Sequence, residues 1–267
     1  MKKYFIVAAA ALLLAACTGK KKAQDAAPAE EAQLPFEEVQ IMKGMSVRLD
    51  SLTEQFARIK PFGIFTKTED GSVALTEEEK MVKPDYLMNP AELADKLDNL
   101  SMKYRACAVY QDDQVVAKAY DMEDVYTAPL TKLLVEINDP SQKYAIEHAN
   151  DANVKEVVFK MAEESGRLGY IWQAAASGII ENLYILNQNQ EKFLVSFTDE
   201  DAENVTFNVV CLVEAYAELA EIDPQFKNIY NVIMPLQVID AITVDQLREQ
   251  LNTLKPQIAE ARKALFL

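Results

Sequence analysis

The stretch "GYIWQAAASGIIENLYILNQNQ", residues 169–190, holds one formal charge, Glu181, in a chain whose net charge is −15. Placed on a helix, its apolar side chains cover most of the circumference, which is typical of a helix surrounded by other helices. The small residues 174–178 allow a neighbouring helix to approach closely. A membrane span is disfavoured because Glu181 and the polar residues 187–189 would lie inside it. We therefore predict a buried central helix.

The composition of the rest of the chain favours helices as well. The whole sequence has seven glycines, fewer than the turns of a sheet protein need, and apolar residues recur at spacings of three and four. We predict an all-α bundle of about seven to nine helices that forms a single domain over residues 36–267. The expected segments are 36–60, a short helix from about 76, 90–120, 121–138, 154–166, 168–190, 198–222, 224–239 and 243–265.

Several helix ends are marked by local signals. Asn89 followed by Pro90 is typical of a helix start, Thr198 precedes three acidic residues, and Gly166 fits a helix C-terminus. Two features should disturb a helix: Asp112–Asp113 predicts an interruption or bend, and Pro129 predicts a kinked or split helix.

The N-terminal segment predicts export. "MKKYFIVAAAALLLAACTGKKK" has lysines at 2 and 3, followed by an apolar run over 4–16 that is too short for a mature membrane span. Its end, Leu14-Ala15-Ala16-Cys17, resembles the bacterial lipobox. The resemblance implies a signal peptide at 1–16, removed before Cys17, and a diacylglycerol on the Cys17 sulfur with an acylated (typically palmitoylated) new amino terminus. Thr18 then implies the outer membrane.

Residues 17–35 should form the lipidated cysteine and a disordered tether, because 18–35 lack apolar periodicity and are rich in Ala, Lys, Glu and Pro. Lys20–Lys22 beside the anchor differ from the acidic residues that follow the cysteine in some surface-exported lipoproteins of the Bacteroidetes type, and this difference favours the periplasm-facing leaflet. The predicted partner is thus the membrane, through the lipid on Cys17. A nucleic-acid partner is excluded by the acidic balance, since phosphate binding needs a basic surface.

Glu181 has two interpretations. As an isolated buried carboxyl it could be a general acid or base, whereas as a structural residue it would form an ion pair, with Lys103 or Arg105 as candidates. The structural interpretation is favoured because no second titratable group stands in a recognisable context. Tyr170, Trp172 and Tyr184 are the other candidate ligand or interaction residues on this helix, although Trp172, the sole tryptophan, fits a core anchor better.

The sequence offers little other chemistry. Cys107 and Cys211 lie in predicted core helices, so they are either free buried thiols or a disulfide. The single histidine, His148, has no metal-ligand or triad spacing around it, and no phosphate-binding or nucleophile motif occurs. We therefore expect no metal site, no cofactor and no enzymatic activity.

Further landmarks are Asn89-Pro90, the tyrosines of "YRACAVY" at 104–110, and "IIENLYIL" at 179–186 after Trp172. Together they resemble uncharacterised all-helical lipoproteins of Bacteroidetes, over most of the chain after residue 85, although Cys107 stands where that pattern has an acidic residue. The resemblance implies fold and location alone. The expected function is a non-enzymatic interaction or scaffold protein of the cell envelope with an envelope protein as partner. The alternatives are a periplasmic small-ligand-binding lipoprotein and, less favoured, an enzyme organised around Glu181.

Overall fold

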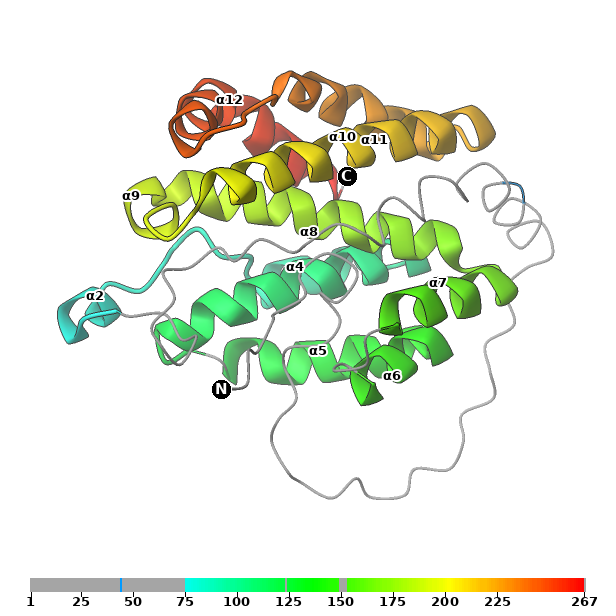
Figure 1. The fold of residues 1–267 in the computed structure, drawn as a ribbon. Helices are drawn as coiled ribbons and strands as arrows, with labels where there is room; N and C mark the ends of the chain where they lie inside the picture. The colour runs from blue at the N-terminus through cyan, green and yellow to red at the C-terminus, as the bar shows by residue number, and fades with distance from the viewer. Residues whose placement is uncertain (1–43, 45–74, 123, 149–152, 267) are drawn as a thin grey trace.

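The fold is all-α, as predicted. The computed structural model describes residues 44, 75–122, 124–148 and 153–266, and within them the chain forms eleven α-helices and two 3-10 helices without a strand (Figure 1). The number exceeds the seven to nine expected because the predicted helix 90–120 is two helices, and because Pro140–Glu147 and Gln190–Phe193 form helices that were not expected. The elements are α2 (Glu77–Met81), α3 (Pro90–Leu93), η1 (Ala94–Lys96), α4 (Leu100–Ala119), α5 (Asp124–Ile137), α6 (Pro140–Glu147), α7 (Val154–Glu164), α8 (Leu168–Gln188), α9 (Gln190–Phe193), α10 (Asp199–Ile222), α11 (Gln225–Ile233), η2 (Met234–Val238) and α12 (Val244–Ala264).

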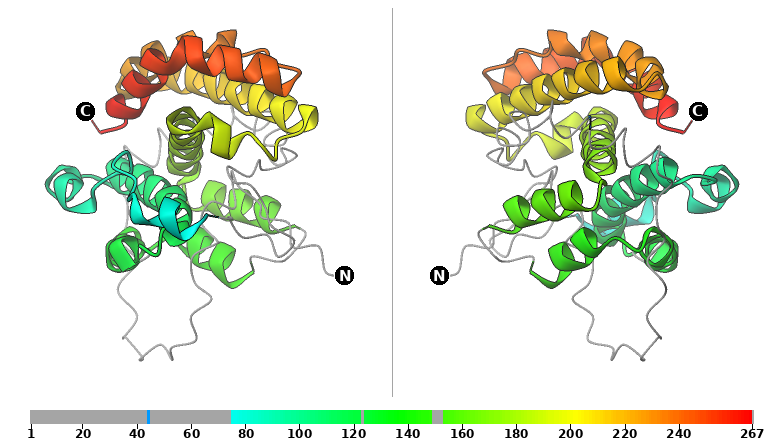
Figure 2. Two further views of the ribbon diagram at one scale, coloured as in Figure 1. Left: turned by 90° about the vertical axis from the view of Figure 1, so that its left-hand side faces the viewer. Right: turned by 90° about the vertical axis from the view of Figure 1, so that its right-hand side faces the viewer.

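The helices lie in layers around α8. In Figure 1 the helices α4 to α7 lie below α8 and α10 to α12 lie above it, and the side views of Figure 2 show the same order. Helix α8 makes its most extensive contacts with α4 on one side and with α12 on the other. The central helix thus joins a part of the chain that precedes it to a part that follows it.

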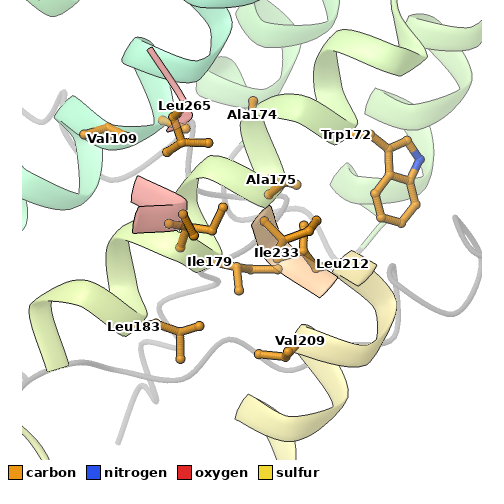
Figure 3. Packing of buried hydrophobic residues seen from close by; sticks show 14 of the residues in the cluster. Val109, Trp172, Ala174, Ala175, Ile179, Leu183, Val209, Leu212, Ile233 and Leu265 are labelled. Carbon is orange, nitrogen blue, oxygen red and sulfur yellow. The ribbon is translucent and has the colours of Figure 1, made fainter. Parts of the chain in front are cut away.

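The predicted burial of α8 is confirmed. Nineteen of its 21 residues are buried, including five polar or charged ones. Figure 3 shows Ile179 and Leu183 of α8 facing Val209 and Leu212 of α10 inside the hydrophobic core. In the part of the chain that the structure describes, no helix has the length and apolar character needed to cross a membrane.

The local signals at helix ends are confirmed. Thr198 and Asp201 form a reciprocal capping box at the start of α10, and the Asn89 side chain accepts from the Ala91 N–H at 3.1 Å. Gly166 has φ 72°, and the Arg167 N–H after it reaches back to the Ala162 carbonyl. That left-handed residue after α7 requires glycine.

Two expectations about helix continuity are wrong. Helix 90–120 is not one element: it ends after η1 and restarts as α4, with Asn99 capping the Met102 N–H at 2.9 Å. Conversely, α4 runs without interruption through Asp112–Asp113, because these side chains are buried against neighbouring helices instead of competing with the backbone. Helix α5 contains Pro129 and continues through it, so of the predicted kink or split the split does not occur. The expected helix 36–60 (apart from residue 44), the tether and Cys17 lie outside the described residues.

Candidate functional site

An ion pair joins the middle of α8 to the end of α12. The Arg262 guanidinium donates from Nε to one carboxylate oxygen of Glu181 and from Nη2 to the other, both at 2.7 Å. The Glu181 side chain is 0% exposed, so this two-point contact is the kind of charge-assisted pairing that a buried carboxylate needs.

The predicted ion-pair partners of Glu181 are wrong. Lys103 pairs with Glu136 at 2.8 Å, and Arg105 donates to the side chain of Gln173. Both candidates lie on α4, which packs against one side of α8. Glu181 instead pairs with a residue of α12, which packs against another side. Because Arg262 comes 81 positions after Glu181 in the chain, the local spacing of residues around Glu181 gave no signal for this partner.

A second carboxyl lies directly beside Glu181. Asp113 on α4 is fully buried, and its Oδ2 accepts the Met88 N–H at 2.8 Å. Burial and, after it, the negative charge of Glu181 raise the pKa of Asp113 well above its usual value, which favours the protonated form of this carboxyl.

A third carboxyl, Asp112, completes the group. It is buried, its Oδ2 accepts from Asn182 Nδ2 at 3.4 Å, and burial followed by the charge of Glu181 raises its pKa well above the usual value. We call Asp112, Asp113 and Glu181 the carboxyl cluster. The charge of Glu181 is balanced by Arg262, and the raised pKa values of the two aspartates favour their neutral forms.

The four candidate residues of α8 separate into two groups. Tyr184 lies under the Arg262 guanidinium, 4.0 Å from ring centroid to Cζ, so Arg262 connects it to Glu181. Tyr170 instead stacks on Tyr104 with centroids 5.2 Å apart. Trp172 is buried and tilted against Phe159, as a core anchor would be. Tyr170 and Trp172 therefore contact other parts of the core and do not extend the cluster.

Sequence reasoning missed Asp112, Asp113 and Arg262. Adjacent aspartates in the middle of a predicted helix were a signal, but they were interpreted as an interruption or bend of that helix. Within the described residues, no set of three or more His, Cys, Asp or Glu side chains is placed to hold a metal ion. The cluster therefore consists of three buried carboxyl groups, one of which forms an ion pair with Arg262.

The remaining candidates lie outside the cluster. Cys107 and Cys211 are both free and buried, in α4 and α10. His148 stacks on Tyr144 with ring centroids 4.1 Å apart. A pocket of about 240 Å³ lies on the surface between η2 and α12, far along α12 from Arg262, and is lined by Val238, Gln246, Glu249, Gln250, Thr253 and Leu254.

Comparisons with known proteins give no relative: no protein family, no curated protein and no solved structure matches this chain.

Proposed function

We propose that the protein is a lipid-anchored component of the cell envelope that acts by binding another envelope protein. The lipobox-like Leu14–Cys17 supports an anchor at Cys17, and the following lysines support the periplasm-facing leaflet of the outer membrane. The acidic balance of the chain favours a partner whose contact face is basic.

The observation that carries the proposal is an apolar surface beside a pocket. Val238 and Ile242 are each 58% exposed. Both residues lie close to α12. Val238 lines the pocket together with side chains of α12, and the Ile242 N–H donates to Oε1 of one of these side chains, Gln246, at 3.0 Å. We call Val238, Ile242 and the pocket wall of α12 the η2–α12 surface. Neighbouring exposed apolar side chains around a cavity are typical of a protein interface.

The size and lining of the pocket favour a protein over a small ligand. Its volume of about 240 Å³ is below the ~300–1,000 Å³ of typical ligand sites. It suits one apolar side chain of a partner, whereas Glu249 and the amides of Gln246 and Gln250 on its wall can bind basic and polar groups at the rim.

The test is in-cell crosslinking of the full chain, followed by mass spectrometry of the proteins that copurify. A defined partner should be captured by the natural protein and lost from Val238→Asp, which places a charge on the η2–α12 surface. The matched control is Val135→Asp on α5, where Val135 is 69% exposed on the opposite layer. Cys17→Ala should lose the partner by losing the membrane. A partner retained by Val238→Asp would exclude this surface.

One observation favours a second candidate function, general acid–base catalysis. Asp113 is a carboxyl whose pKa is raised by burial and by the nearby Glu181 carboxylate, and two carboxyls with different pKa values are what proton transfer uses. Against it, both oxygens of Glu181 are held by Arg262 and the side chain is enclosed. Catalysis would be supported if substrate screening found an activity that Glu181→Gln abolishes while the free energy of unfolding is unchanged.

A further inference from the structure

Arg105 is a buried cation whose hydrogen bonds go to neutral groups. Arg105 is 6% exposed. Its Nε and Nη2 donate to Gln173 Oε1 at 2.9 and 2.7 Å, and its Nη1 donates to the Leu265 carbonyl at 3.0 Å. In the described part of the chain no carboxylate pairs with it, and burial lowers its pKa. A buried charge without a counter-charge is costly, so the structure lacks a compensating group here.

Two more polar groups at this point have no partner. Gln173 Nε2 on α8 and the Tyr216 hydroxyl on α10 are buried and make no hydrogen bond among the described residues. The positive charge of Arg105 also acts on Tyr216. Burial raises the pKa of Tyr216 to about 12, and the guanidinium of Arg105 opposes this rise. Gln173 contacts Arg105 directly, and Tyr216 lies within electrostatic range of Arg105, so the three side chains belong to the part of the core to which α4, α8, α10 and the end of α12 contribute.

The unpaired groups are almost all donors. A guanidinium has five N–H groups and an amide nitrogen has two. Three of the five guanidinium N–H groups of Arg105 donate to the partners given above, so two have no acceptor. Both N–H groups of Gln173 Nε2 and the O–H of Tyr216 have no acceptor either. A buried water would accept from some of these groups but would need acceptors for its own hydrogens. An anion needs donors only and also balances the guanidinium.

We propose that Arg105, Gln173 and Tyr216 form a buried site for a small monovalent anion, either a halide such as chloride or a short carboxylate. The anion accepts from the free N–H groups of Arg105 and Gln173 and from the Tyr216 hydroxyl. This site is separate from the η2–α12 surface, so it stands whether or not that surface binds a protein. It also lies apart from the carboxyl cluster, which is further along α4 and α8.

The first test measures stability of the full chain in sodium chloride and in sodium gluconate at equal ionic strength, because gluconate is too large for the site. Binding to the folded state alone stabilises it. Well above the dissociation constant, a tenfold rise in chloride should lower the unfolding equilibrium constant about tenfold more than the same rise in gluconate. Arg105→Met should abolish the difference, whereas Arg248→Met on α12 should keep it. Tyr216→Phe, which retains the ring packed on Phe226, should weaken it.

The second test locates the anion directly and does not depend on a variant that folds. Crystals of the natural protein grown in bromide should show an anomalous peak within hydrogen-bond distance of the Arg105 guanidinium. Carboxylate-shaped density at that position in halide-free acetate would identify the short-carboxylate alternative. Equal stability in chloride, acetate and gluconate, together with an ordinary water or no density at the site in both crystals, would overturn the proposal.

Discussion

Glu181 and Arg262 are 81 positions apart in the sequence, yet two hydrogen bonds of 2.7 Å join both oxygens of the carboxylate to the guanidinium. The guanidinium also lies over the Tyr184 ring, three residues after Glu181 on the same helix. One side chain of α12 is thereby fixed to two side chains of α8. This contact is one of those that join α12 to the central helix.

Replacing Arg262 by methionine should destabilise the protein by about 3–5 kcal/mol, because Glu181 would remain buried beside Asp113 without its counter-charge. The free energy of unfolding, measured by urea denaturation, tests this. Arg248→Met on the same helix is the control and should change stability by less than about 1 kcal/mol. A loss no larger than that of the control would show that the ion pair contributes little.

Replacing both partners should be better tolerated than replacing one. In the variant Glu181→Met with Arg262→Met, no unpaired charge is left in the core, and apolar side chains of similar length fill the space. We expect the double variant to be more stable than Arg262→Met alone. A double-mutant cycle measures the coupling, and a strictly additive result would argue against a direct interaction between the two residues.

Stability should fall as the pH rises above about 4, the pKa of aspartate in an unfolded chain. Folding raises the pKa of Asp112 and Asp113, so the folded state holds protons that the unfolded state has released. Each group can contribute up to about 1.4 kcal/mol per pH unit until its folded pKa is passed. In Asp113→Asn the amide oxygen can still accept from Met88, and the dependence on pH between 5 and 7 should be shallower.

The control for the pH experiment is Asp245→Asn, which changes an exposed aspartate in the first turn of α12. Its pH dependence should match that of the natural protein. If Asp113→Asn had the same slope as this control, the proton would not reside on Asp113.

The two core thiols should be unreactive in the folded protein. Burial raises the pKa of Cys107 to about 12 and that of Cys211 to about 11, so neither forms the reactive thiolate at neutral pH. A thiol reagent should label both only after denaturation. Labelling of neither cysteine in the denatured, unreduced protein would instead show the disulfide alternative.

The sequence predicted those parts of the fold that depend on neighbouring residues. The buried helix α8 follows from apolar residues on all its faces, and the starts of α3 and α10 follow from Asn89 and Thr198. The restart of α4 at Leu100 also had a local cause, the cap at Asn99, but the continuous helical periodicity obscured it.

The candidate site was only partly predictable. Glu181 could be singled out as the one charge of its stretch, and Tyr184 lies close to it, but the other members come from separate helices. Arg262 looks like an ordinary basic residue near a helix end. Asp112 and Asp113 were interpreted as an interruption or bend of the helix, because sequence alone does not show that both are buried and that burial raises their pKa.

The enclosure of α8 has a consequence for the order in which the protein is made. Helix α8 leaves the ribosome before α10 and α12, so its second half is synthesised long before the guanidinium that neutralises Glu181. A nascent or truncated chain that ends before residue 262 would have to bury an unpaired carboxylate or leave the core open. The last turns of α12 therefore complete the folding unit, and chains lacking them should be recognised as incomplete by cellular proteases.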